Sequence, residues 1–247
     1  MNIQQYLTQR EQRRAQEVQF RNICKACMQP DSWCYCKLLE PFDCKMEFVI
    51  LLHPLEKRRR IASGRMSHLM LKHSHIILGH NYSDDPNVNE VIADPKYYPV
   101  ILHLDQNSIH LNSLSEDGKK TLCPPNKKLL IFVVDGTWNT ASKTVRLSKN
   151  LNALPRISFT PNKPSRFRVR QQPKPMCFST LEAIHQTIEL LGDSQGFDTK
   201  RGEHHKLLKV FDSFVAIQAD YLQALKDKTG TLHYRKRQRP SFTGISA

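Results

Sequence analysis

An unbroken apolar run, LLIFVV (129–134), ends abruptly in Asp135 and Gly136. Apolar, strand-forming residues without polar interruption are typical of a central strand in a parallel sheet, because both faces of such a strand are covered. We expect further strands at 45–53, 75–79, 98–104 and 156–159, helices at 57–73, 137–154, 179–192 and 204–225, and a loop over 113–128. This alternation of strands and helices predicts an α/β fold with a parallel sheet.

The charge of the chain favours a polyanionic partner. Lysine and arginine number 37 against 23 aspartate and glutamate, which gives a formal net charge of +14 over 247 residues. Nucleic acid fits this excess better than an anionic membrane, because no predicted helix is strongly apolar on one face and basic on the other. No apolar run approaches the roughly 18–20 residues of a membrane span, and residues 1–20 lack the apolar segment of a secretory signal, so we expect a cytoplasmic protein.

The clearest ligand pattern is C-x2-C-x6-C-x-C, formed by Cys24, Cys27, Cys34 and Cys36. Two closely spaced thiolate pairs can close a tetrahedral four-thiolate zinc site, with Pro30 turning the chain between them. Such a zinc is structural, because no coordination position stays open for a reaction. The alternatives are four thiols without metal, or a redox pair. The odd total of seven cysteines argues against a disulfide framework.

The polar residues after the apolar run form a candidate ligand site. In open α/β sheets, ligands bind at the carboxyl ends of the strands, where Asp135 is expected. Gly136 allows the backbone to approach a ligand, Thr137 can cap the next helix, and Trp138 offers a flat apolar face. The alternative is that Asp-Gly is only a turn, that the threonine is only a cap and that the tryptophan belongs to the core.

A basic segment, SRFRVRQQP (165–173), is a candidate phosphate-binding strand. Side chains alternate between the two faces of a strand, so Arg166, Arg168 and Arg170 would project together. Three guanidinium groups in a row suit a nucleic-acid backbone. The alternative is an exposed edge strand that its charges protect from pairing.

Two further segments offer polar groups next to predicted strand and helix ends. HPLEKRRR (53–60) follows a strand, and its His53 is either a ligand-binding or a structural residue, while Lys57 and Arg58 are candidate RNA contacts. STLEA (179–183) opens a helix with Ser179 and Glu182 at the spacing of a capping box. The capping box alone nearly accounts for the second segment.

Taken in this order, the segments resemble the DTW-domain family. The shared elements, over about residues 22–192, are the cysteine quartet, HPLEKRR, DGTW followed by Ala141, LPRISF, RFRVRQQP and STLEA. The best-known members of the family are tRNA-uridine aminocarboxypropyltransferases, which are similar to the SPOUT class of knotted folds and use S-adenosylmethionine. This chain departs from the family at Ala62-Ser63-Gly64, where Asn-Thr-Gly is frequent.

The resemblance implies a C-terminal trefoil knot around the strand that ends in Asp135. It assigns the reaction to Asp135, Thr137 and Trp138, and it implies that S-adenosylmethionine lies against His53, Pro54, Gly136, Leu154, Pro155, Ser179 and Thr180. The corresponding segments are a basic N-terminal helix (1–21), a four-cysteine zinc-binding element (22–40), a DTW catalytic domain (41–200), a C-terminal helix (201–226) and a basic flexible tail (227–247).

The implied reaction transfers the 3-amino-3-carboxypropyl group of S-adenosylmethionine to N3 of a tRNA uridine and releases methylthioadenosine. The leaving thioether is neutral and needs no acid, whereas N3 carries a proton and needs a base, for which Asp135 is the candidate. Selection of the carboxypropyl carbon over the methyl group depends on positioning. The alternatives are a SPOUT-type RNA methyltransferase, a non-catalytic zinc-containing RNA-binding protein, and ribosomal RNA as the substrate.

Overall fold

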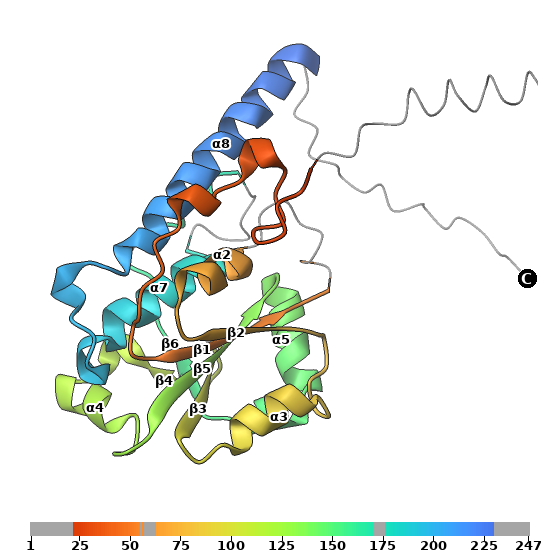
Figure 1. Ribbon diagram of the computed structural model, residues 1–247. Coiled ribbons are helices and arrows are strands. Elements are labelled where there is room, and N and C mark those ends of the chain that lie inside the picture. The colour runs from red at the N-terminus through yellow and green to blue at the C-terminus, as the bar shows by residue number, and fades with distance from the viewer. Residues whose placement is uncertain (1–21, 55, 57–62, 170–175, 230–247) are drawn as a thin grey trace, which may run out of the picture.

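The computed structural model describes residues 22–54, 56, 63–169 and 176–229. It contains a six-stranded sheet with the order β2-β1-β5-β3-β6-β4 (Figure 1). Every neighbouring pair is parallel, which confirms the predicted fold class. The strands are β1 (Glu47–Leu52), β2 (Ser74–Leu78), β3 (Tyr97–Leu102), β4 (Ile109–His110), β5 (Lys128–Asp135) and β6 (Arg156–Ser158).

The apolar run at 129–134 forms the middle of the sheet. It belongs to β5, which pairs with β1 on one side and with β3 on the other. Residues 129–133 are buried, as expected for a strand covered on both faces. β1 and β5 end level with each other, because Leu52 pairs with Asp135. The segments that follow these two strands therefore leave the sheet side by side.

Helices cover both faces of the sheet, and successive strand residues face opposite layers. Ile50 and Ile131 belong to the core on the side of α2 (Ser63–Met70), α7 (Thr180–Leu191) and α8 (His205–Thr229). Leu51 and Leu130 belong to the core on the side of α3 (Pro86–Ala93), α5 (Trp138–Leu147) and α6 (Lys149–Asn152). The two layers of helices are visible in Figure 1.

The four-cysteine element packs along α8, beside which it lies in Figure 1. Its short helices are η1 (Asp31–Trp33) and η2 (Cys36–Leu38). Trp33 and Tyr35 meet Tyr221 and Phe214 of α8 edge to face, with ring centroids 4.8 and 5.2 Å apart. Each such pair contributes about 0.5–1.5 kcal/mol beyond the area it buries. Within the described part of the chain, no helix combines the length and apolar character that crossing a membrane requires.

Three sequence-based expectations about secondary structure are wrong. The expected loop at 113–128 contains a short helix, α4 (Glu116–Thr121), whose first turn is capped by Ser115. The expected helix at 137–154 is divided into α5 and α6 at Ser148, whose Oγ donates to the Thr144 carbonyl oxygen and accepts from the Tyr82 N–H. The expected strand at 166–170 is a turn over its described residues, as shown below. The expected helix at 1–21 and residues 230–247 of the expected tail lie outside the described residues, while residues 227–229 belong to α8.

One helix lies in a segment for which no secondary structure was predicted. This is α3, whose first turn is capped by the Asp85 side chain, which accepts a hydrogen bond from the Val88 N–H. Pro86 occupies the first helical position, where its missing N–H costs no hydrogen bond. The cap and the proline together define the start of this helix.

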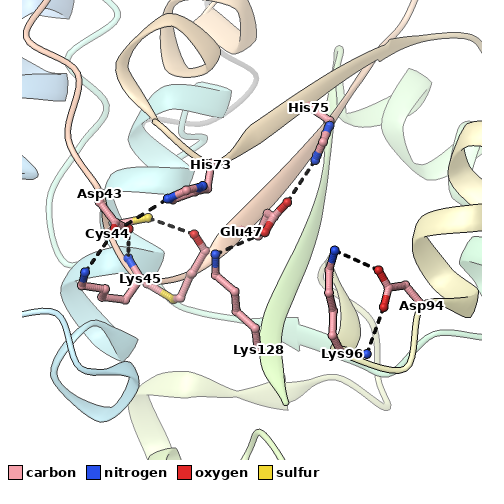
Figure 2. A network of polar contacts seen from close by, with 10 residues as sticks. Asp43, Cys44, Lys45, Glu47, His73, His75, Asp94, Lys96 and Lys128 are labelled. Carbon is pink, nitrogen blue, oxygen red and sulfur yellow. Dashed lines mark hydrogen bonds and ion pairs between the residues drawn. The ribbon is translucent and has the colours of Figure 1, made fainter. Parts of the chain in front are cut away.

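A buried carboxylate, that of Glu47, links three neighbouring strands at the amino edge of the sheet. Figure 2 shows it between His75 of β2 and Lys128 of β5. Its oxygens lie 3.0 Å from His75 Nε2 and 3.2 Å from Lys128 Nζ. Burial opposes ionisation of this carboxyl, but hydrogen bonds from Tyr97, His75 and Lys128 outweigh it and lower its pKa. The ionised form therefore stabilises the sheet.

We predict that Glu47→Gln lowers the free energy of unfolding by about 1–3 kcal/mol at pH 7. Because the pKa of Glu47 is lower in the folded chain, its stabilising effect is present above its ordinary value of 4.5 and is lost as the pH falls through the folded-state pKa. The difference from wild type should thus shrink below pH 4.5. Urea unfolding at several pH values measures it, with Asp117→Asn in the exposed Asp117–Lys120 pair as a control of small effect. An undiminished difference at acidic pH would contradict the prediction.

Candidate active site

Asp135, the last residue of β5, is buried and held from two sides. Its Oδ1 accepts a hydrogen bond from Thr180 Oγ1 at 2.6 Å, and its Oδ2 accepts one from the Gly64 N–H at 3.2 Å. Only 5% of the residue is exposed. The carboxylate therefore joins the central strand to the starts of α2 and α7, at the edge where ligands bind in parallel sheets.

Gly64 permits this contact because it has no side chain. A Cβ atom at this position would lie 2.6 Å from Asp135 Oδ2 and 2.9 Å from Ile50 Cγ2. Both distances are shorter than atoms tolerate, so any larger residue would displace the carboxylate or the helix. Within the segment Ala62-Ser63-Gly64, the structure thus shows a role for Gly64. Ser63 is buried beside it, and Ala62 lies outside the described residues.

The residues after Asp135 combine a helix cap with an exposed indole. Thr137 begins α5, and its Oγ1 accepts a hydrogen bond from the Thr140 N–H at 3.2 Å, which confirms the predicted cap. Gly136 is also constrained, since a Cβ there would lie 2.5 Å from Thr140 Oγ1. Trp138 is 44% exposed, so its indole is not part of the core.

The turn after β1 lies beside these residues. The His53 N–H donates to the Asp135 carbonyl oxygen at 3.2 Å, and the Glu56 N–H donates to the His53 carbonyl oxygen at 2.8 Å. His53 is half-buried and Pro54 is exposed. The structure thus brings the HPLE and DGTW segments together, as the parallel pairing of β1 with β5 requires.

Leu154 and Pro155 are not brought to Asp135. They precede β6, whose Arg156 pairs with Ile101, which in turn pairs with Phe132 of β5. Pro155 and Leu154 therefore lie level with the middle of β5, two strands away and on the order of 15 Å below Asp135 at about 3.3 Å per residue. Their expected place beside a cofactor rests on the resemblance alone.

The start of α7 is organised by the buried carboxylate of Glu182. The predicted capping box is present: the Ser179 Oγ accepts from the Glu182 N–H, and the Glu182 carboxylate accepts from the Ser179 N–H at 2.8 Å. The same carboxylate accepts hydrogen bonds from Ser165 Oγ at 2.8 Å and from the Arg166 N–H at 2.6 Å. Glu182 thus joins the basic segment to the helix that carries Thr180.

The described part of the basic segment, 165–169, is a turn rather than the expected strand. The Arg168 N–H donates to the Arg166 carbonyl oxygen at 2.8 Å, which closes the turn. Phe167 is buried edge to face against Phe211 of α8, while Arg166 and Arg168 are exposed on either side of it. The expected separation of arginine from phenylalanine is therefore present, but the anchors are Glu182 and Phe211 and not a strand ladder.

Of the candidate RNA-contacting residues, Arg166 and Arg168 lie among the described residues. Arg166 Nη1 lies 2.5 Å from Asp212 Oδ2 in an exposed ion pair. Arg166 and Lys163 also line a cleft of about 530 Å³ between the 162–166 segment, α7 and α8. Lys57, Arg58 and Arg170 lie outside the described residues.

The four cysteine thiols converge as the spacing predicts. Cys24 Sγ lies 3.6 Å from Cys36 Sγ, Cys27 Sγ lies 3.7 Å from Cys34 Sγ, and all four sulfur atoms lie within 4.8 Å of one another. Backbone N–H groups of Cys27 and Ala26 are the main cause that lowers the pKa of Cys24 to about 6, whereas burial raises the pKa of Cys27 and of Cys36. Met28 adopts a left-handed conformation (φ 59°), which turns the chain just after the first pair. All seven cysteines are free thiols.

The fold and the site define an α/β protein whose polar motifs gather at the carboxyl edge of a parallel sheet. A family model, the DTW domain, matches residues 21–219, and the chain belongs to this family. No solved structure matches the chain.

Named relatives are similar to the chain over part of their length. The tRNA-uridine aminocarboxypropyltransferase 2 of Drosophila melanogaster is 26% identical over 179 residues, which cover 69% of this chain and 67% of that protein. The protein of the same name from Mus musculus is 24% identical over 176 residues, covering 69% of this chain and 57% of that protein. The chain thus spans somewhat more than half the length of the mouse relative.

The sequence did not reveal two positions that the site depends on. The contact of Gly64 with Asp135 joins residues 71 positions apart, and a glycine in a basic helical segment carries no signal of it. Glu182 was expected as a capping residue, but its bonds to Ser165 and Arg166 were not. The sequence did not indicate that Glu182 is buried. A buried carboxylate needs additional hydrogen-bond donors, whereas a capping glutamate in solvent does not.

We predict that Gly64→Ala lowers the free energy of unfolding by about 1–3 kcal/mol, because the new methyl group overlaps the Asp135 carboxylate and Ile50. Chemical denaturation monitored by tryptophan fluorescence measures the change. Gly118→Ala in α4 is the matched control: its Cβ would approach no atom closer than 3.3 Å, and its effect should stay within about 1 kcal/mol. Equal stability of the Gly64→Ala variant and the wild type would show that the site can open without cost.

Proposed function

We propose that the chain transfers the 3-amino-3-carboxypropyl group of S-adenosylmethionine to N3 of a uridine in tRNA, with release of methylthioadenosine. The observation that carries the proposal is the buried Asp135 carboxylate, on which the DGTW segment, the start of α2 and the STLEA segment converge. Membership of the DTW family and the names of the relatives support the choice of reaction and substrate.

The residues around Asp135 fit S-adenosylmethionine. The indole of Trp138 stays 44% exposed beside a buried carboxylate, so an apolar face is open to a ligand at this edge. His53, Pro54, Gly136, Ser179 and Thr180 would hold the cofactor around it. When bound, S-adenosylmethionine supplies a carbon that is activated by the adjacent sulfonium. The chain's own residues hold the uridine in line with that carbon and accept the proton from N3 of the uridine.

In this proposal Asp135 is the base and its two neighbours position it. A carboxylate has about four lone-pair sites, and the Thr180 hydroxyl and the Gly64 N–H each occupy one on a different oxygen. The two fixed donors orient the carboxylate before the substrate arrives, which reduces the cost of reorganisation during the reaction.

A SPOUT-like knotted fold is also part of the proposal. Its support lies in the path of the chain after β5. β6 lies beyond β3, on the far side of β5 from β1, and the chain then returns to the carboxyl end of β5, where Thr180 meets Asp135. The DTW family match supports the same fold.

We further propose that the four thiols bind a structural zinc ion. Their mutual distances and their complement of four sulfur ligands fit a closed tetrahedral site. Such an ion would fix the element that packs against Phe214 and Tyr221 of α8. It takes no part in the proposed transfer.

The direct test is incubation of the protein with S-adenosylmethionine and unmodified tRNA, followed by mass spectrometry of the nucleosides. The expected product is a uridine that carries the aminocarboxypropyl group, with one methylthioadenosine per modification. A methyl adduct with S-adenosylhomocysteine would instead identify a methyltransferase. Binding of tRNA without either product would indicate a non-catalytic RNA-binding protein. Ribosomal RNA transcripts in parallel reactions separate the two substrate classes.

We predict that Asp135→Asn lowers the rate of transfer about 10²–10⁴-fold while the affinity for S-adenosylmethionine is retained. Thr180→Val should lower the rate less, because it removes one positioning hydrogen bond, and Thr180→Ser should restore it. Single-turnover kinetics and calorimetric titration of the cofactor measure the two effects. Near-normal turnover by Asp135→Asn would exclude this carboxylate as the base.

We predict that replacing Arg166 and Arg168 together by glutamine weakens tRNA binding and lowers the slope of log affinity against log salt by about 1–2. Conversely, Asp212→Asn should strengthen binding, because it frees Arg166 from its ion pair. Lys120→Gln, which removes an exposed cation from α4, is the control. Unchanged affinity and salt dependence in the double variant would place the RNA elsewhere on the protein.

A further inference from the structure

A second group of metal-binding side chains lies between α7 and the start of α8, apart from the cysteines. His185 and Glu189 lie one turn apart on α7, His205 is the first residue of α8, and His204 directly precedes it. One ligand atom from each of the four residues can be chosen so that all lie within 4.8 Å of one another. No step of the proposed reaction uses these residues.

The four side chains are arranged around a common point. His185 Nε2 lies 2.9 Å from His205 Nδ1, and His204 Nε2 contacts the Glu189 carboxylate. The rings of His204 and His205 are 4.2 Å apart between centroids, and that of His185 lies 4.9 and 5.2 Å from them.

One ring nitrogen of the buried His204 side chain lacks a hydrogen-bond partner within the described residues. Its residue is fully buried, and its Nδ1 finds no hydrogen-bond partner within the described residues. A buried polar atom without a partner costs about 1–3 kcal/mol, so proteins seldom keep one without a reason. A metal ion coordinated by His204 Nδ1 would provide the missing partner.

We propose that His185, Glu189, His204 and His205 bind a divalent transition-metal ion, with zinc as the preferred ion. Imidazole nitrogen and carboxylate oxygen are ordinary zinc ligands. Tetrahedral zinc with bonds of about 2.0–2.1 Å holds its ligand atoms about 3.3 Å apart. The His185 Nε2–His205 Nδ1 distance of 2.9 Å is somewhat below this value, and all four ligand atoms lie within 4.8 Å of one another. Small side-chain adjustments therefore complete the site.

The position of the cluster indicates a structural role with access from solvent. His185, Glu189 and His205 line the 530 Å³ cleft, so an ion can enter from that side. Four protein ligands close the coordination shell, which is typical of structural zinc. The ion would clamp the start of α8 to α7, the helix whose first residue, Thr180, holds Asp135.

The test is the zinc content of the full chain after equilibration with excess zinc and extensive dialysis. The expected values are two zinc ions per wild-type chain and one for Glu189→Gln combined with His205→Gln. Cys24→Ser combined with Cys36→Ser should lose the other ion. His110→Gln, which alters a histidine paired with Thr160 far along the chain, should keep both. Glu189→Gln alone, at an exposed position, is the second variant should the double variant fail to fold, and it should weaken zinc binding at least tenfold against a chromophoric chelator.

Cobalt substitution identifies the ligands of each ion. Sulfur-to-cobalt charge-transfer bands should persist in the histidine-site variant and disappear in the cysteine variant, whereas weaker bands of nitrogen- and oxygen-bound cobalt should do the opposite. Zinc should also raise the melting temperature of the cysteine variant, and this effect should be lost when Glu189→Gln and His205→Gln are added to it. One zinc ion in the wild type that only the cysteine variant loses, or two ions that persist when Glu189 and His205 are changed, would overturn the proposal. Neither result depends on whether the chain transfers an aminocarboxypropyl group.

Discussion

The positions of two helices relative to the sheet depend on the hydrogen bonds of one buried carboxylate, that of Asp135. An unpaired Asp135 at the end of a central strand would be costly, since a charge taken out of water needs compensating hydrogen bonds. Thr180 and the Gly64 N–H supply them from two helices that are distant in sequence. The same bonds fix the positions of those helices relative to the sheet. The bonds that compensate the charge are therefore the same bonds that assemble the candidate site.

The sequence predicted the parts of this arrangement that follow from local patterns. The apolar run of β5, the Thr137 cap and the Ser179–Glu182 capping box are each encoded within a few residues, and all three are present. The convergence of the four thiols likewise followed from their spacing. Parallel pairing then explains why the segments after β1 and β5 meet.

The features that the sequence could not predict depend on contacts between residues that are far apart in the chain. Alternating arginine and hydrophobic residues at 166–170 have the period of a strand, but Glu182 and Phe211 capture the described part of this segment as a turn. Ser148 interrupts a helical pattern because Tyr82, 66 positions away, offers it an N–H. The position of Leu154 follows from the short length and the register of β6, and the LPRISF motif indicates neither of them.

The 25-residue helix α8 carries contacts of three kinds along its length. His205 meets α7, Phe211 and Asp212 meet the basic turn, and Phe214 and Tyr221 meet the cysteine element. One residue more or less within this stretch would rotate everything beyond it by about 100° and shift it by about 1.5 Å. An insertion or deletion between positions 205 and 221 would therefore disrupt these contacts, whereas a change of length in the connection that precedes the helix would leave their spacing along α8 unchanged.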